Sequence, residues 1–375
     1  CVLIVLIFLT LIPSYSLTHS LTLSLMFTVN IVKYAPYDSN LIFGMTDTSV
    51  LTFDIRREGL IVKDAHALLY KVPDIVEGTN GEDGNSDELC ELSSFDVHPA
   101  ENLHLIAVGD DNGIVTIIDS VTGNVTRQLS RVHSNVVGAV TFQPNSRSYL
   151  SSGGFDSLFC CWDFSRGRPS GDVVDFSRDQ VQQQQMANPP FVHDLLYKDG
   201  GKRVVVAVGD GTLRLMKYTP KQGFVTAYRK EDAHGGMSTC VCDYCPTAMA
   251  GQQCVLSAGI DCVVRGWKIT DNNSSGGASG HQQTVSKSSS SSKSNKKKGK
   301  NKSKQNHIIT SDTSTSETVS EPHSFESLFT IDHKEKINAI GFVGDIEGEA
   351  DSSASSGMVM VADVTSTWKL YKLHV

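Results

Sequence analysis

Two stretches of the chain decide the fold, and they share one pattern. They read Ser152-Gly-Gly-Phe-Asp156-Ser-Leu-Phe-Cys-Cys-Trp162-Asp163 and Ser257-Ala-Gly-Ile-Asp261-Cys-Val-Val-Arg-Gly-Trp267. Each stretch has small residues that end a strand, then a tight polar turn, and then alternating residues that lead to a Trp. In both, a Ser lies ten positions before the Trp and an Asp lies six positions before it. The chain therefore contains an internal repeat.

The same spacing recurs four more times with other residues at the bulky position. In every copy a turn residue lies six positions before the bulky one. The separations between copies indicate a period of about 45 residues with insertions, which suits a unit of four short strands. The bulky positions of the six copies are Phe53, Ile118, Trp162, Met216, Trp267 and Tyr371.

A His opens three of the repeats, and these residues are His133, His234 and His333. A buried His needs partners for both ring nitrogens, and a buried Trp N–H needs an acceptor. We therefore expect two hydrogen-bonded quartets inside the fold. Their members are His133, Ser152, Asp156 and Trp162 in one repeat, and His234, Ser257, Asp261 and Trp267 in the other.

The two quartets and their spacing resemble the WD-repeat (WD40-type) β-propeller family, over residues 27–271 and 325–375. The resemblance implies an all-β propeller with one four-stranded blade per repeat. Six blades are recognisable, and we expect seven in the intact protein, with the first blade missing or replaced by residues 1–26. The resemblance also implies a non-enzymatic scaffold for protein–protein interactions that needs no cofactor.

An enzyme is the main alternative class. Ser152, His133 and Asp156 are the residue types of a hydrolase triad. The same types recur in a second repeat, whereas an enzyme needs one site, so we expect a structural role and no catalytic residues. The sequence has no G-x-S-x-G elbow, Walker loop, H-E-x-x-H or dinucleotide fingerprint. An enzyme that uses the central funnel of the propeller stays open as an interpretation.

The cysteines indicate a reducing compartment. Nine cysteines in 375 residues do not make a disulfide scaffold, and Cys160 and Cys161 are adjacent in an apolar run. Cys240, Cys242 and Cys245 cluster, and with His234 they could bind zinc. Strand alternation explains the first two equally well, and no second Cys/His pair is present. We therefore predict no metal site.

The net charge of −8 is spread unevenly along the chain. Residues 272–324 carry eight Lys and three acidic residues, whereas the remainder carries 25 basic and 38 acidic residues. The Ser-, Gly-, Gln- and Lys-rich composition of this segment predicts a disordered insertion. Its lysine cluster is typical of a nuclear-localisation signal, and no aromatic residue interleaves it as nucleic-acid binding would favour. The cluster comprises Lys296, Lys297, Lys298, Lys300, Lys302 and Lys304.

The first 26 residues are apolar, carry no charge, and begin with Cys1 rather than Met. A secretory signal would have a basic start, and Pro13 interrupts a membrane span. A gene-model artefact, a signal or anchor, and a genuine strand all stay open. A secreted or membrane-anchored propeller is therefore a further alternative, although the cysteines and the lysine cluster favour a cytoplasmic and/or nuclear protein without a membrane partner. The expected domains are residues 1–26, blades at 27–271, the insertion at 272–324, and a final blade at 325–375.

The order of the features is similar to that of one family member in particular. That resemblance implies a candidate substrate receptor of a cullin-4 RING ubiquitin ligase. Such receptors dock on an adaptor, the large subunit of damage-specific DNA-binding protein, through a Trp-Asp-x-Arg box. The box here would be Phe53-Asp54-Ile55-Arg56, with Phe in place of Trp.

Within this box, the resemblance implies that Phe53, Asp54 and Arg56 carry the docking. Arg56 is the member that can pair with an acidic adaptor surface. The alternative is that Arg56 is an ordinary surface arginine. A second, weaker box follows Trp162, with Ser165 where the box requires Arg and Arg166 one residue late.

Overall fold

The structure is a computed structural model. It describes residues 29–54, 56, 67–72, 90–179, 188–235, 237–244, 253–271, 323–343, 356–364 and 368–374. Residues 1–270 and 323–375 belong to one compact unit, and everything below concerns that unit. The predicted segment at residues 1–26 and the lysine cluster lie outside the described residues. No helix among the described residues is long and apolar enough to cross a membrane.

The first three sheets are antiparallel and follow one another along the chain. The strands of the first are β1 (Ile31–Ala35), β2 (Asp38–Met45), β3 (Ser49–Asp54) and β4 (Ala67–Lys71). Those of the second are β5 (Leu92–Val97), β6 (Leu105–Asp110), β7 (Val115–Asp119) and β8 (Val125–Leu129). Those of the third are β9 (Ala139–Phe142), β10 (Tyr149–Gly153), β11 (Leu158–Asp163) and β12 (Arg168–Pro169), with β13 (Val174–Asp175) also paired to β11.

The last three sheets repeat this arrangement. The strands of the fourth are β14 (Val192–Lys198), β15 (Arg203–Val208), β16 (Leu213–Thr219) and β17 (Gly223–Lys230). Those of the fifth are β18 (Ser238–Tyr244), β19 (Gln253–Gly259), β20 (Val263–Asp271) and β21 (His323–Asp332). Those of the sixth are β22 (Ile337–Val343), β23 (Ser356–Asp363) and β24 (Trp368–His374).

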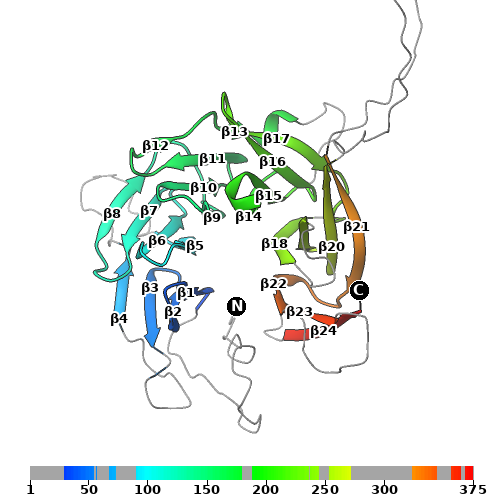
Figure 1. The fold of residues 1–375 in the computed structure, drawn as a ribbon, viewed down its shortest axis with the longest axis horizontal. Helices are drawn as coiled ribbons and strands as arrows, with labels where there is room; N and C mark the ends of the chain where they lie inside the picture. The colour runs from blue at the N-terminus through cyan, green and yellow to red at the C-terminus, as the bar shows by residue number, and fades with distance from the viewer. Residues whose placement is uncertain are drawn as a thin grey trace, which may run out of the picture. The chain divides into compact units, whose positions relative to one another are not determined.

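The first strands of the sheets pack against one another in chain order. Contacts join β1 to β5, β5 to β9, β9 to β14, β14 to β18 and β18 to β22. Figure 1 shows the same order as a change of colour from blue through green to red around one centre. The prediction of an all-β propeller with six recognisable blades is confirmed. A seventh blade stays a prediction.

The hydrophobic core lies between neighbouring sheets, because middle strands such as β15 are buried on both faces. In β15, Val204, Val206 and Val208 pack toward the third sheet, whereas Val205 and Ala207 pack toward the fifth. Successive side chains of a strand point to opposite faces, so a continuous apolar run fills two interfaces at once.

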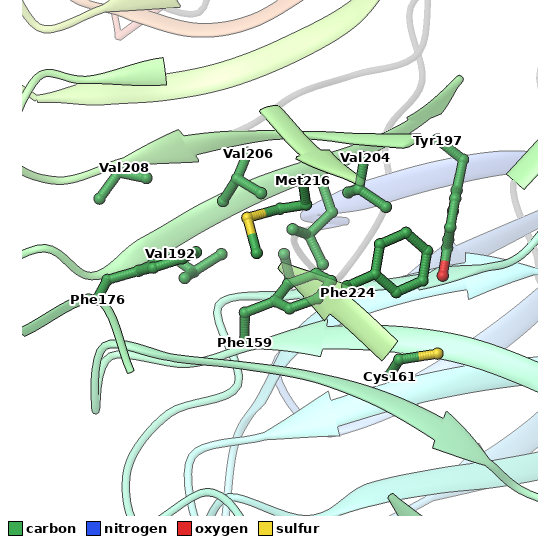
Figure 2. Close-up of a cluster of buried hydrophobic side chains, with 12 residues drawn as sticks. Phe159, Cys161, Phe176, Val192, Tyr197, Val204, Val206, Val208, Met216 and Phe224 are labelled. Carbon is green, nitrogen blue, oxygen red and sulfur yellow. The ribbon is translucent and has the colours of Figure 1, made fainter. Parts of the chain in front are cut away.

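Figure 2 shows the interface between the third and fourth sheets. The ring of Phe224 from β17 contacts Phe159 of β11 and Tyr197 of β14 edge to face, with ring centroids 5.9 Å and 6.1 Å apart. Cys161 belongs to this cluster, whereas Cys160 belongs to the cluster on the opposite face of β11. The adjacent cysteines are therefore buried free thiols in two different interfaces.

One predicted boundary is corrected by the sheet topology. The final blade predicted at residues 325–375 begins later in the structure, because β21 completes the fifth sheet. The insertion therefore separates the third and fourth strands of one blade rather than two blades. The reason is that each repeat begins with the outer strand of one sheet and continues into the next sheet. Ser324, assigned to the insertion, lies in β21, where its Oγ is 2.5 Å from Thr270 Oγ1.

Candidate functional site

The structure brings together all four members of the first predicted quartet. His133 lies in the connection between β8 and β9, and its Nε2 is 2.7 Å from Ser152 Oγ. Its Nδ1 is 3.1 Å from Asp156 Oδ1. Trp162 Nε1 donates a hydrogen bond of 2.7 Å to the same Ser152 oxygen. One hydroxyl on β10 thus serves two buried rings from different segments of the chain.

The groups around Asp156 favour the charged form of its carboxyl group. Burial alone would raise the pKa of this carboxyl, but hydrogen bonds from His133 and the charge that the ring can carry outweigh burial and lower it. The backbone N–H of Ser134 adds a bond of 2.9 Å. Asp156 therefore remains an acceptor that fixes the imidazole in place.

The connectivity from Asp156 through His133 to Ser152 is that of a hydrolase triad, but the site is closed. Ser152 is fully buried, and the side chain of His133 is 0% exposed. The Ser152 hydroxyl already bonds the indole of Trp162. A nucleophile must reach its substrate, so this arrangement is suited to holding strands together and not to acyl transfer.

The fifth sheet repeats the quartet. His234 Nε2 is 2.8 Å from Ser257 Oγ, and Trp267 Nε1 donates to that oxygen over 2.8 Å. His234 Nδ1 is 2.9 Å from Asp261 Oδ1. Arg265 adds a contact that the third sheet lacks, with Nη1 2.7 Å from Asp261 Oδ2. Burial would raise the pKa of Asp261, but the bonds from His234 and Arg265 lower it well below its usual range.

The sixth sheet has a variant that sequence reasoning missed in part. His333 Nε2 lies 3.0 Å from Asp363 Oδ2, and its Nδ1 lies 2.7 Å from the hydroxyl of Tyr371. His333 and Tyr371 were recognised as repeat positions, but Asp363 was not assigned a role. Asp363 is at the end of β23 and 2% exposed. The signal that could have found it is an acidic residue at the end of an otherwise apolar run.

Two glycines, Gly154 and Gly259, have a packing role beside the histidines of the quartets. A Cβ on Gly154 would lie 2.6 Å from His133 Nδ1 and 2.5 Å from Asp156 Oδ1. A Cβ on Gly259 would lie 2.8 Å from the ring of His234. Glycine is needed at both places because the imidazole packs directly on the backbone.

The turn after β3 holds the predicted docking arginine on the surface. Asp54 binds the guanidinium of Arg56 through two oxygens, with distances of 2.9 Å to Nε and 2.8 Å to Nη2. The backbone N–H of Arg56 donates to Asp54 over 3.0 Å. Asp38, in β2, lies 3.4 Å from Nη2. The Arg56 side chain is nonetheless 56% exposed, so its charged end is positioned but accessible.

The remaining member of the box lies inside the fold. Phe53 is 8% exposed and packs with Ile42 and Leu51. Its ring covers Gly44, where a Cβ would lie 2.9 Å from Cε2. Phe53 therefore contributes to packing within the first sheet and not to the surface of the turn. Ile55 lies outside the described residues.

The second, weaker box, in the third sheet, holds its arginine differently from the box that contains Arg56. Arg166 Nε is 3.3 Å from Asp163 Oδ2, and the side chain is 66% exposed. Ser165 uses its hydroxyl to bond Asp163 Oδ1 over 2.6 Å. Asp163 therefore divides its contacts between two residues, and the bidentate pair seen at Arg56 does not form.

The cysteine cluster near His234 is not brought together as a ligand set by the described residues. Cys240 is buried in β18 and packs with Leu256 and Ile337. The side chain of Cys242 and all of Cys245 lie outside the description. His234 has both ring nitrogens engaged by Ser257 and Asp261.

One other group of possible ligands appears among the described residues: Cys90, Asp110 and Asp111. Asp110 Oδ1 already accepts the N–H groups of Asn112 and Ile114, at 3.0 Å and 2.8 Å. Burial raises the pKa of the Cys90 thiol to about 12, which keeps it protonated. Turn formation explains the position of Asp110 without an ion.

Comparison with known proteins places these features in context. No family model matches the chain. A curated relative, the WD repeat-containing protein 53 homolog of Dictyostelium discoideum, is 28% identical over 181 residues. The match covers 44% of this chain and 44% of the relative, so less than half of that protein is represented.

A chain in a crystal structure of the mitotic checkpoint complex has the same fold. Its TM-score is 0.50 with 12% sequence identity, over 92% of this chain and 76% of that chain. Identity at this level speaks for the fold alone.

The six sheets define a β-propeller, and both the two His–Ser–Asp–Trp quartets and the curated match support a similarity to WD-repeat proteins. Among WD-repeat proteins, the chain is similar to the WD repeat-containing protein 53 homolog. Proteins of this family are generally non-enzymatic scaffolds that bind other proteins.

Proposed function

We propose that this scaffold is a substrate receptor of a cullin-4 RING ubiquitin ligase, and that the turn after β3 docks on the adaptor. One observation carries the proposal. Asp54 holds the Arg56 guanidinium through two hydrogen bonds while the side chain stays 56% exposed.

The energetics favour such an arginine as an anchor. A free surface arginine loses rotamer freedom when it binds, which weakens the complex. Asp54 and Asp38 restrict Arg56 before any partner arrives. The guanidinium has five donors, so it can keep its bonds to Asp54 and still offer others to a carboxylate on the adaptor.

The test is a binding measurement between the full chain and the purified adaptor. Arg56→Ala should weaken binding at least tenfold, since a central arginine is a frequent hot spot. The melting temperature should stay that of the wild type because the side chain is on the surface.

Arg166→Ala is the matched control, because Arg166 also follows a third strand and pairs with its turn Asp. It should bind the adaptor as the wild type does. Wild-type binding by Arg56→Ala would overturn the proposal, and the protein would then be a WD-repeat scaffold with another partner.

A further inference from the structure

The sixth sheet differs from the other five at its outer edge. In those five sheets the third strand pairs with a further strand on its outer side, which is β4, β8, β12 with β13, β17 or β21. β24 holds the third place in the sixth sheet, and among the described residues it pairs only with β23. An edge strand leaves a row of N–H and C=O groups without ladder partners. The outer edge of β24 can therefore accept one more strand.

The chain order indicates which segment would supply this strand. Each outer strand leads into the first strand of the next sheet along the chain. β8 leads into β9 across residues 130–138, β17 into β18 across residues 231–237, and β21 into β22 across residues 333–336. If the same rule connects the last sheet with the first, the outer strand of the sixth sheet is the segment that precedes β1.

The segment before β1 has the residue pattern of a strand. Leu21, Leu23 and Leu25 alternate with Thr22 and Ser24, and residues 20–26 contain no Gly, Pro or charged residue. Alternation with a period of two is typical of a strand with one buried face. Residues 27–30 would then lead into β1, which begins at Ile31. That connection is as short as the one between β21 and β22.

The surface of β24 suits the apolar face of such a strand. Tyr371 packs toward the fifth sheet with Val359 and Val361. Its neighbour Leu370 points to the opposite face, because side chains alternate along a strand, and it is 44% exposed. A strand beside β24 that turns its leucines to this face would cover Leu370 and remove apolar surface from water.

We propose that residues 20–26 form the fourth strand of the sixth sheet, antiparallel to β24. This pairing is independent of adaptor docking. It selects the genuine strand among the three interpretations that the sequence leaves open for residues 1–26. The sixth sheet would then contain strands from both ends of the chain, so the last sheet could not separate from the first without breaking a strand ladder.

Hydrogen exchange of the full wild-type chain, followed by mass spectrometry, tests this pairing without any variant. Amides of residues 20–26 should exchange roughly tenfold or more slowly than in an unfolded peptide of the same sequence, because ladder hydrogen bonds protect them. Exchange of these amides at the peptide's rate in the folded protein would overturn the proposal. That result is expected for a signal, an anchor or a seventh blade placed between the sixth and first sheets.

Two proline variants test whether β24 is the partner. Neighbouring N–H groups of a strand point to opposite sides, so Thr22→Pro or Leu23→Pro must remove a donor to β24. The more disruptive variant should speed exchange of the β24 amides about tenfold. Exchange in β17 should not change, which shows that the remaining sheets stay folded. Ser290→Pro, in the insertion, is the matched control and should leave β24 as in the wild type. Unchanged exchange of β24 in both strand variants would contradict the pairing.

Discussion

Arg214 and Asp210 form an ion pair that is enclosed within the fourth sheet. Nη2 of Arg214 lies 3.1 Å from Asp210 Oδ2, and both side chains are 0% exposed. The guanidinium also lies over the ring of Phe176, 4.3 Å from its centroid. The same pair occurs at Asp261 and Arg265 in the fifth sheet. The fourth repeat therefore keeps the turn Asp although its quartet is absent.

This ion pair predicts which of two variants loses more free energy of unfolding. Asp210→Ala leaves the Arg214 charge inside the sheet, and breaking such a pair from one side costs about 3–5 kcal/mol. Arg214→Met should cost less, because Asp210 keeps its bonds to Thr212 and its contact with Arg229. Urea denaturation would measure both. Equal costs, or the reverse order, would contradict the role given to the buried charge.

Asp156 should be needed for stability. Asp156→Ala removes the partner of a buried imidazole nitrogen and of the Ser134 N–H, with an expected cost of about 1–3 kcal/mol in the free energy of unfolding. Asp172→Ala is the control, since Asp172 is exposed on the surface. If the two variants unfold at the same urea concentration, the quartet does not stabilise the fold.

Stability should fall in mild acid because of His193. Burial, with a smaller contribution from the charge of Lys336, lowers the pKa of this ring to about 4, and the ring packs against Phe155. Below the ordinary histidine pKa of about 6.5 the unfolded chain binds a proton that the folded ring does not, so stability is lost as pH falls from about 6.5 to 4.

The expected loss in the free energy of unfolding from His193 is about 2 kcal/mol, because the partial exposure of the ring makes the change smaller than the full pKa difference would give. Urea midpoints at pH 7 and pH 4.5 would measure it. His193→Phe should show a smaller drop between the two values than the wild type. An equal drop in both proteins would mean that other groups cause the acid sensitivity.

The lysine cluster predicts a change of location in cells. Replacing Lys296, Lys297 and Lys298, together with the lysines at 300, 302 and 304, by Gln should reduce nuclear accumulation of a fluorescent fusion. The replacements lie outside the residues that form the described strands, so the amount of folded protein should not change. An unchanged nuclear-to-cytoplasmic ratio would leave the cluster as a solvated charge run.

Much of the fold could be predicted because its determinants are local. The spacing between Ser152, Asp156 and Trp162 belongs to one hairpin, and strand alternation fixes which faces those residues share. His133 is distant in sequence from the other three residues, but a His recurs at the start of repeats, so all four members of the quartet could be predicted from the sequence. Strand alternation also places Cys160 and Cys161 on opposite faces, but only the structure shows that each of these faces packs in a different interface.

Features that depend on three-dimensional neighbours could not be predicted. Nothing in the residue types says that Tyr37 reaches Ser120, or that Arg56 is held by Asp38 from another strand. The boundary at His323 was missed because a strand that follows a long polar insertion has no local mark of the sheet it joins. The irregular pairing at Val192/Asp194 and Ser238/Cys240 recurs between sheets without a shared sequence signal.

The position of the insertion gives the fifth sheet an unusual assembly. β20 and β21 belong to one sheet, although residues 272–322 intervene between them. A single cut in that interval would sever none of the strand pairings that the structure describes. The product would be a two-chain complex, with one fragment ending after β20 and the other carrying β21 and the sixth sheet. Residues 272–322 are thus a natural place to divide the propeller into two complementing fragments. Their reassociation would report how strongly the fifth sheet binds its last strand, β21.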